Sequence, residues 1–419
     1  VWLARFGGTK RHGQSFLAVV CNRFRQLFVV QIALLFGLMP LTVLLFDRIA
    51  WLATPVNLVA VPIFSMVTVP FSLIGLGLGD IVSQASHIAL KVAATSVEYL
   101  SLLIAAAARL PFADVRVPAL IGPQLLIAAL PALLVLIPRG WPGRYVALLS
   151  VAALLLYSPK APDKGCVQLH VLDVGQGLAT VLQTHGSTLL FDTGASFRGG
   201  GSVGERTVVP FLRSKGIRQI DWLLVSHADI DHSGGVGAIY DYADVSRLLV
   251  GEALSDAGPA SSRCRAGQRW TADQVRFQVV HPDTDVVWQG NDSSCVLLVE
   301  VGRYGLLLTG DIEADAERAI IAANDLSHVE IVVIPHHGSA TSSGTPFVNA
   351  VSPNIAIVSA GYGNRWGFPK AAVVARWQAV GATVLNTATA GAVSVRLCRD
   401  GGVQAVRLDR QERRRFWRN

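Results

Sequence analysis

The chain has 419 residues, of which 51% are hydrophobic and only 16% are charged. This composition argues against an ordinary soluble enzyme. The net charge of +7 favours partners that carry phosphate groups, such as nucleic acid or acidic lipid.

Long uncharged stretches in the first third of the chain predict membrane-spanning helices. About 20 apolar residues are needed to cross a bilayer core of about 30 Å, and the stretches 27–46, 56–79 and 119–137 meet or approach that length. Pro62 and Pro70 interrupt the second stretch, which a membrane helix tolerates when its neighbours satisfy the freed carbonyls. Buried helices of a soluble protein are the alternative, which the length and number of these stretches disfavour.

Two further stretches leave the number of spans open. Residues 145–157 suit either a span or an interfacial helix, and residues 81–108 carry Lys91 and Glu98 in an otherwise apolar sequence. Basic residues before the first stretch favour a cytoplasmic start. If 81–108 spans the membrane, the C-terminal part lies outside the cytoplasm, and if it lies flat in the interface, that part lies inside. We expect no cleaved signal peptide, because the first apolar run is too long.

A second domain is predicted to begin after a cluster of proline, lysine and glycine at residues 158–165. Apolar residues then alternate at Val167, Leu169 and Val171, which fits a half-buried strand. Strand-like and helical stretches alternate from there to Leu408, a pattern that suits two sheets sandwiched between helices. The expected organisation is membrane helices over 1–158, an α/β domain over 165–408 and a basic tail over 409–419.

The most informative stretch is a loop rich in histidine and aspartate at residues 226–235. The apolar run 222–225 precedes it and reads as a buried strand. The polar spacing cannot follow one face of a helix or strand, and it suits a tight loop around a cation. A polar turn with solvated side chains is the alternative. The side chains in this loop that can bind metal are His227, Asp229, Asp231 and His232.

Two later apolar runs end in similar groups. Residues 306–308 precede Gly-Asp311, and residues 331–334 precede Pro-His336-His337-Gly. Each piece alone would be an ordinary polar turn. In layered α/β folds, however, strand ends at one edge form a common site, so the three runs together predict a shared metal centre.

These motifs resemble the metallo-β-lactamase superfamily. Residues 172–177 (LDVGQG) and 291–297 (NDSSCVL) narrow the resemblance to the hydrolase-like domain of the ComEC family of competence DNA-uptake channels. The first third is similar to the end of that family's membrane domain, so the chain resembles a partial member. The resemblance implies an N-terminal α-helical membrane segment and a C-terminal α/β metallo-β-lactamase-like αββα sandwich. It also implies a multi-pass protein of the cytoplasmic (inner) membrane, with the hydrolase-like domain outside the cytoplasm.

The superfamily pattern implies two divalent metal ions. Asp229 stands where most members have histidine, and a harder, oxygen-rich site favours Mn²⁺ over Zn²⁺, which remains the alternative. Two such ions about 3.5–4 Å apart would activate water and neutralise charge on a phosphoryl group. The implied ligands are His227 and Asp229 for one ion, Asp231 and His232 for the other, Asp311 as the bridge, and His337 from the last loop.

The expected catalytic residues are Asp231, His336 and Asp173. By the resemblance, His336 would face the substrate as a phosphate contact or a proton donor. Asp173 is expected to orient a ligand histidine from behind, and a turn-capping aspartate is the alternative. The superfamily's remaining histidine ligand has no clear match, and residues 291–292 and His281 are the candidates.

Basic residues near aromatic ones offer candidate DNA contacts. Range 396–419 is rich in arginine, and loop 361–370 pairs cations with Trp366 and Phe368. Such groups can hold phosphates and stack on bases. A basic tail near anionic lipid and a loop packed by its own aromatics are the alternatives. The candidate DNA contacts are Arg365, Lys370, Arg413, Arg414 and Arg415.

The five cysteines contain no Cys-x-x-Cys pair, which disfavours a zinc ribbon. An extracytoplasmic domain is compatible with a disulfide between Cys166 and Cys398 or between Cys264 and Cys295. Five reduced thiols are the alternative.

Three functions fit these observations. The first is a membrane DNA-uptake channel whose metal-dependent nuclease domain degrades the strand that is not imported. Its partners would be single-stranded DNA, membrane lipid and other proteins of the competence machinery. The second is a catalytically weak module that guides DNA, and the third is a membrane-tethered phosphoesterase of a small or lipid-linked substrate. The near-complete ligand set favours the first or third, and the membrane resemblance favours the first.

Overall fold

A computed structural model of the chain describes residues 16–46, 48–79, 82–110, 113, 115–116, 145, 149, 160–254 and 261–412. The chain divides into two compact units, Val1–Ser158 and Pro159–Asn419, and each is described by itself.

The first unit is helical. Its described helices are α1 (Phe16–Phe46), α2 (Ala53–Ile63), the π-helical turn η2 (Phe64–Thr68), α3 (Val69–Leu78) and α4 (Ser83–Ala108). Two-residue strands β1 (Arg48–Ile49) and β2 (Val115–Arg116) pair antiparallel.

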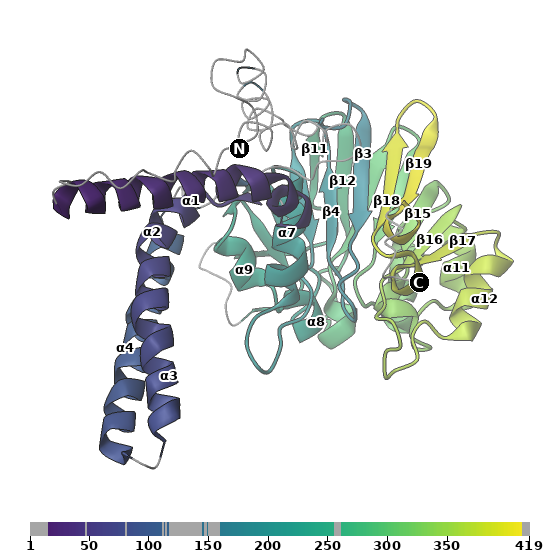
Figure 1. Ribbon diagram of the computed structural model, residues 1–419. Helices are drawn as coiled ribbons and strands as arrows, with labels where there is room; N and C mark the ends of the chain where they lie inside the picture. The colour runs from purple at the N-terminus through teal and green to yellow at the C-terminus, as the bar shows by residue number, and fades with distance from the viewer. Residues whose placement is uncertain are drawn as a thin grey trace. The chain divides into compact units, whose positions relative to one another are not determined.

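Helices α2, η2 and α3 follow one another without a break, and α4 runs back beside them as a hairpin (Figure 1). A hydrogen bond of 2.8 Å joins the Ser86 hydroxyl to the Gly75 carbonyl. A Cβ at Gly75 would lie only 2.6 Å from Leu90 Cγ, so glycine permits the close approach of the helices. Lys91 and Glu98 are exposed.

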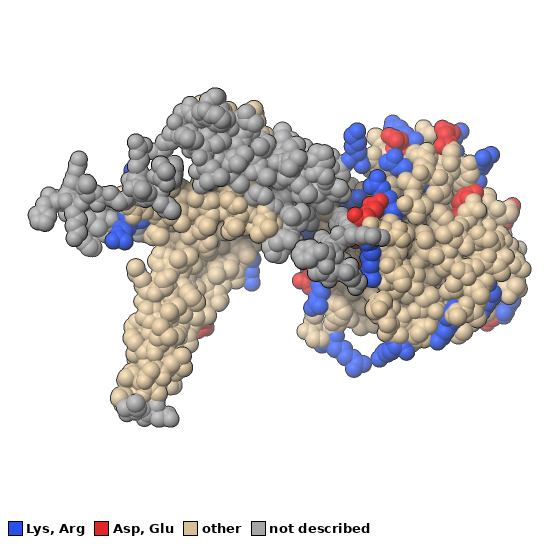
Figure 2. Space-filling view, turned by 45° about the vertical axis from the view of Figure 1, so that its right-hand side comes forward, with Lys and Arg blue, Asp and Glu red and all other residues tan. Residues whose placement is uncertain are grey.

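The apolar stretches that were expected to span the membrane correspond only in part to helices of this unit. Among the described residues, two helical stretches are long and apolar enough to cross a membrane, Ala53–Leu78 and Ser83–Ala108. Figure 2 shows few charged groups on the visible face of the α2–α4 hairpin. The stretch 27–46 lies within α1. The expected stretches 119–137 and 145–157 lie outside the described residues, apart from Tyr145 and Leu149.

Two stacked sheets form the centre of the second unit. The eight-stranded sheet has the order β10-β9-β7-β5-β4-β3-β18-β19, and the seven-stranded sheet has the order β11 to β17. The first sheet comprises β3 (Cys166–Val171), β4 (Thr180–Gln183), β5 (Thr188–Phe191), β7 (Trp222–Val225), β9 (Leu248–Val250), β10 (Ser261–Arg263), β18 (Val393–Cys398) and β19 (Gly402–Leu408). The second comprises β11 (Arg269–Ala272), β12 (Val275–His281), β13 (Val296–Val301), β14 (Tyr304–Leu308), β15 (Val329–Val333), β16 (Ile355–Val358) and β17 (Thr383–Asn386). A small separate pair joins β6 (Gln219–Ile220) to β8 (Asp244–Val245).

Helices cover both outer faces of the sandwich. Helices α7 (Val209–Ser214) and α9 (Val236–Tyr240) pack on the first sheet, and α10 (Ala314–Ala323), α11 (Thr345–Val351) and α12 (Ala371–Ala379) pack on the second (Figure 1). A third apolar cluster fills the space between the sheets. The αββα sandwich expected from the sequence is therefore confirmed. The remaining short helices are η3 (Gly204–Val208), α8 (Ile230–Ser233), η4 (Gly290–Ser293), η5 (Pro335–Gly338), α13 (Thr387–Ala390) and α14 (Asp409–Glu412).

Parallel pairing fixes where the polar loops emerge. Strands β5, β7 and β9 are parallel neighbours in the first sheet, and β14, β15, β16 and β17 are parallel neighbours in the second. Their carboxyl ends therefore carry loops to one edge of each sheet. Gly310 lies where the edges meet, because a Cβ there would come within 2.7 Å of Ser226 Cβ.

Two disulfide bonds cross-link this unit. Cys166 bonds to Cys398, and Cys264 bonds to Cys295, while Cys21 is free. Both pairings considered from the sequence are formed.

Candidate metal centre

The loop after β7 delivers two buried histidines. His227 is the second residue after β7, and His232 lies on the one-turn helix α8. Both rings are 0% exposed, whereas the side chains of Asp231 and Asp229 are 29% and 61% exposed. The same loop therefore offers an inner pair of imidazoles and an outer pair of carboxylates.

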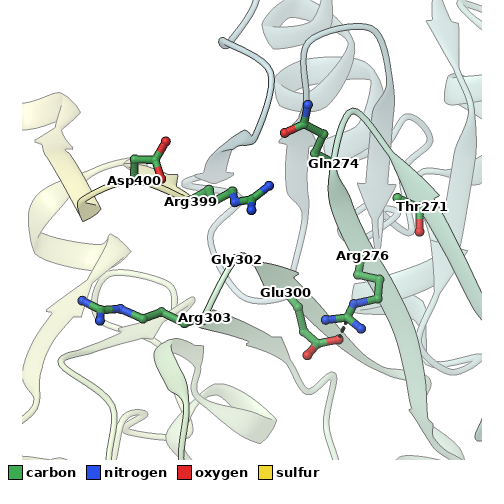
Figure 3. A pocket seen from close by; sticks show the side chains of 8 residues that line it. All are labelled: Thr271, Gln274, Arg276, Glu300, Gly302, Arg303, Arg399 and Asp400. Carbon is green, nitrogen blue, oxygen red and sulfur yellow. Dashed lines mark ion pairs between the residues drawn. The ribbon is translucent and has the colours of Figure 1, made fainter.

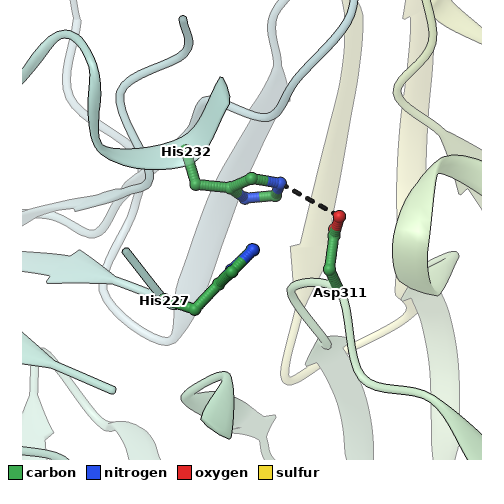
Figure 4. Close-up of side chains that lie close together, drawn as sticks. All are labelled: His227, His232 and Asp311. Carbon is green, nitrogen blue, oxygen red and sulfur yellow. Dashed lines mark ion pairs between the residues drawn. The ribbon is translucent and has the colours of Figure 1, made fainter. Parts of the chain in front are cut away.

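Two loops of the second sheet complete the cluster. Asp311 follows β14, and its Oδ2 lies 3.2 Å from His232 Nε2 (Figure 4) and 3.4 Å from His337 Nε2. His337 Nε2 also lies 3.4 Å from Asp231 Oδ2, and His227 Nε2 lies 3.6 Å from Asp229 Oδ2. The structure thus brings together all six residues expected to bind metal.

Within this cluster two triads could hold a cation, since their ligand atoms lie within 4.8 Å of one another. One triad is His227, His232 and Asp311 (Figure 4), and the other is Asp231, His232 and His337. The buried atoms that lack a hydrogen-bond partner in the described part of the chain include His227 Nε2, His232 Nε2, His337 Nε2 and Asp311 Oδ1. Leaving such atoms unpaired costs free energy that a bound cation removes. The donor set therefore fits metal.

Asp192, which the sequence analysis did not identify, supports the His232 ring directly and the His227 ring through Ser226. Its Oδ2 accepts hydrogen bonds from His232 Nδ1 at 2.7 Å and from the Ser226 hydroxyl at 2.8 Å, and its Oδ1 accepts from the Ser226 amide at 2.6 Å. The Ser226 oxygen in turn lies 3.0 Å from His227 Nδ1. A signal existed, since Asp192 follows a fourth apolar run, which becomes β5.

These contacts select the tautomer of each ring. A carboxylate or a carbonyl can only accept, so His232 Nδ1 and His337 Nδ1, which lies 2.9 Å from the Ser359 carbonyl, must carry hydrogen. The Ser226 hydroxyl donates to Asp192, so it accepts from His227 Nδ1. In its neutral form, each of the three histidines therefore has its free electron pair on Nε2, the atom that faces the cluster centre.

The electrostatics of the cluster favour a cation. Burial would raise the pKa of Asp311, but His232 and His337 hold this pKa far below its usual range. Burial would lower the pKa of His232, but the carboxylates of Asp311 and Asp192 raise it well above its usual value. The pKa of His337 is raised in the same way, chiefly by Asp311 against the effect of burial. The buried carboxylates thus stabilise positive charge at this centre.

Several other expected residues lie elsewhere. Asp173 pairs with Arg410 at 2.8 Å, and the position behind a ligand histidine that was expected for it is taken by Asp192. His281 Nε2 bonds to the Asp292 carbonyl at 2.7 Å, and the Asn291 amide donates to Glu313.

Ser294 is the residue of the 291–297 motif that reaches the cluster. Its hydroxyl oxygen accepts from the Asp311 amide at 3.1 Å and lies 3.4 Å from His227 Nδ1. It supports two candidate ligands without being one.

His336 lies at the rim. His336 and His337 both have left-handed backbones, with φ of 51° and 55°, which send one ring to the rim and the other into the centre. His336 Nδ1 lies 3.2 Å from Glu313 Oε1 and 3.1 Å from the Thr341 hydroxyl. The Thr341 hydroxyl also donates to Glu313 at 2.9 Å, so Glu313 contacts both His336 and Thr341 at the rim.

The aromatic loop lies beside this rim. The Phe368 ring meets the His336 ring edge-on, with centroids 5.9 Å apart. Arg365 stacks over Trp366 at 4.3 Å, and Lys370 donates to the Trp366 carbonyl at 2.7 Å. The two cations therefore pack on their own loop at the edge of the site. The other candidate DNA contacts, Arg413, Arg414 and Arg415, lie outside the described residues.

Known proteins share both parts of this chain. Residues 172–362 match the family described as "Metallo-beta-lactamase superfamily", and residues 5–142 match the family described as "Competence protein". The chain is 36% identical to "Competence protein ComA" of Neisseria gonorrhoeae over 87% of this chain and 50% of that protein. It is 37% identical to "Recombination protein 2" of Haemophilus influenzae over 58% of this chain and 30% of that protein. It is 25% identical to "ComE operon protein 3" of Bacillus subtilis over 88% of this chain and 52% of that protein.

The chain spans about half the length of two of these relatives and less of the third. The superfamily fold is that of metal-dependent hydrolases, and it implies divalent metal ions at the cluster described above. Both family matches occur, in this order, on the helical unit and on the sandwich, so the chain combines a competence-protein domain with a metallo-β-lactamase domain.

Proposed function

We propose that the sandwich domain is a metal-dependent phosphodiesterase that cleaves single-stranded DNA, and that it serves a membrane DNA-uptake channel by degrading the strand that is not imported. One observation carries the catalytic part of this proposal. Three buried histidines have Nδ1 committed to an acceptor, and their Nε2 atoms converge with Asp311. The competence relatives support DNA as the substrate and the competence machinery as partner.

The composition of the centre supports Mn²⁺ over Zn²⁺. Three carboxylates, Asp229, Asp231 and Asp311, stand with three imidazoles, and such an oxygen-rich set suits harder cations. When bound, two such ions would polarise the phosphoryl group and activate water for attack.

The chain's own residues orient the reacting groups. Asp231 is half-exposed beside His337, so its carboxylate can meet both the centre and incoming solvent. The Thr341 hydroxyl donates to Glu313, so it accepts from His336 Nδ1, which leaves His336 Nε2 to contact a phosphoryl oxygen or to give a proton to the departing oxygen.

The disulfides support a domain outside the cytoplasm, attached to helices in the inner membrane. Disulfides persist in oxidising compartments and are rare in the cytosol. Four of the five cysteines are paired here, and all four lie in the sandwich domain.

The test is cleavage of labelled single-stranded DNA by the full chain in detergent, stripped of metal and then supplied with Mn²⁺, Zn²⁺ or Mg²⁺. We expect Mn²⁺-dependent cleavage that falls to background in Asp311→Ala and His232→Ala. Asp315→Ala is the matched control, because Asp315 is 68% exposed on α10 and pairs with the exposed Arg318.

Each other outcome would contradict the proposal and point to a different explanation. Equal cleavage by Asp311→Ala would assign the activity to a contaminant. Metal-independent DNA binding without cleavage would identify a guiding module. Hydrolysis of a small phosphodiester without cleavage of DNA would identify a phosphoesterase of small or lipid-linked substrates.

A further inference from the structure

A second concave site lies at the other end of the β13–β14 hairpin. The cavity has a volume of about 540 Å³, and its lining includes Thr271, Gln274, Arg276, Glu300 and Arg399 (Figure 3). Strand β13 has six residues, so the cavity and the metal centre are separated by about 20 Å along the strand. Nothing in the catalytic proposal uses this cavity.

The cavity lining carries three guanidinium groups, those of Arg276, Arg303 and Arg399, against two carboxylates, those of Glu300 and Asp400. The Arg276 guanidinium pairs with Glu300 at 3.2 Å, and His328 Nε2 lies 3.7 Å from the same carboxylate, so the charge of Glu300 is compensated. The Arg399 guanidinium has no hydrogen bond or ion pair within the described ranges, and Figure 3 shows it turned toward Gln274 and Arg276. An anion would therefore find unused donors here.

The local backbone holds Arg399 in place. The residue follows Cys398, whose disulfide joins the end of β18 to the start of β3, and its amide donates to the Gly165 carbonyl at 2.8 Å. Its stem crosses the β13–β14 turn at Gly302, where a Cβ would lie 2.8 Å from Arg399 Cγ. Because Gly302 also has a φ of +67°, the turn both adopts a conformation that favours glycine and leaves room for the arginine.

The chemical character of the lining residues indicates which anion the cavity can bind. Every lining residue is polar, charged or glycine, so the cavity offers little apolar surface for a base or an acyl chain. Guanidinium groups pair well with phosphate oxygens. Arg276 and Arg399 come from different sheets, and both are exposed, so a polymer can pass between them. Such a site would contact the backbone of a strand without reading its bases.

We propose that this cavity is an exosite that binds a phosphodiester group of the DNA strand whose other part occupies the metal centre. The inference depends on the proposed function for the identity of the ligand. It adds a length requirement, because only a strand that spans the distance between the two sites can also reach Arg276 and Arg399.

Fluorescence anisotropy on the full chain in detergent, with metal removed by chelation, tests this exosite. The probes are labelled single strands of about 4 and about 16 nucleotides. Arg399→Glu should weaken binding of the longer strand about 5- to 10-fold and lower the slope of log affinity against log salt by about 0.7 for each phosphate group that is no longer neutralised. Binding of the shorter strand should stay unchanged.

The control is Arg318→Glu, which makes the same charge reversal at a residue 67% exposed on α10. Equal affinities of Arg399→Glu and Arg318→Glu for the longer strand would overturn the exosite. Binding of inorganic phosphate in the cavity without any effect on the strand would do so as well. Failure of the catalytic proposal is distinguishable, since it appears as DNA cleavage that survives Asp311→Ala, whatever Arg399→Glu does to binding.

Discussion

The candidate active site has two regions whose side chains are held in different ways. The inner set, His227, His232, Asp311 and His337, is at most 4% exposed, and each histidine is fixed from behind by a hydrogen bond. The rim set comprises Asp229, Glu313, His336 and Thr341. Its members are more exposed; Glu313, His336 and Thr341 contact one another, and Asp229 lies beside His227.

The difference follows from the origin of each set. His227, Asp311 and His337 lie two to four residues after the ends of their strands, and Asp192, next to the end of β5, bonds to His232, so the sheets fix these positions before any ligand binds. The rim residues lie on loops whose hydrogen bonds stay within the loops. Rigid support suits groups that bind a cation, and a more adaptable rim suits contact with a substrate. Substitutions in the two sets should therefore have different consequences.

Among substitutions that leave the metal ligands in place, the largest effect on rate is expected at the rim. His336→Ala should lower the turnover of single-stranded DNA by about 100-fold or more, as loss of a proton donor does. Metal content should stay at the wild-type level, because the His336 ring is outside both ligand triads. Steady-state rates and elemental analysis of the same preparation measure the two quantities.

His185→Ala is the control for this substitution, because His185 is exposed and its ring bonds to the Pro162 carbonyl, away from the cluster. If His336→Ala lost metal in proportion to rate, the separation between rim and inner set would be wrong.

Removing the hydrogen-bond support of the inner set should have a smaller effect, which should appear as weaker metal binding. Asp192→Asn replaces one acceptor oxygen by an NH₂ group, while Ser226 and His232 still present donors to it. Mutation of such outer partners typically costs about 10- to 100-fold in metal affinity. Competition with a chromogenic chelator measures this change.

Asp221→Asn is a closely matched control. Asp221 also accepts from a serine hydroxyl and a backbone amide, those of Ser187 and Thr188, but at the opposite end of the strands. Metal affinities that are equal in the two variants would show that Asp192 has no special role in the centre.

The same contrast explains what the sequence can predict. His227, Asp311 and His337 are predictable because polar residues follow apolar runs, and the ends of parallel strands share an edge. Asp192 follows such a run too, but it is a single acidic residue without a cluster. Its partners lie 34 and 40 positions away, and no local pattern encodes that contact.

The helical hairpin illustrates another limit. The sequence allows residues 81–108 to be either a span or an interfacial helix, because it does not reveal a packing partner. The structure places the small residues Ser86, Ala89 and Ala93 on the buried side of α4, while Lys91 remains exposed. Periodic small residues are a packing signal only once the partner helix is known.

The smallest expected effect concerns the covalent support of the inner set. Cys295 directly follows Ser294, whose hydroxyl contacts His227 and the Asp311 amide, and the Cys295 amide donates to the Ser226 carbonyl at 2.9 Å. Replacing Cys264 and Cys295 together by alanine should lower metal affinity a few-fold, in addition to a loss of stability of about 2–4 kcal/mol. The measurements are thermal unfolding and chelator competition.

The second disulfide supplies the decisive control, because it closes a loop far from the metal centre. Cys166 and Cys398 are 232 residues apart, against 31 for Cys264 and Cys295, so in the chain-entropy model their removal should destabilise the domain more. If metal affinity simply followed global stability, the Cys166→Ala/Cys398→Ala variant would therefore show the larger loss of metal. If the link runs through Ser294, only the Cys264→Ala/Cys295→Ala variant will lose affinity, although it is the more stable of the two.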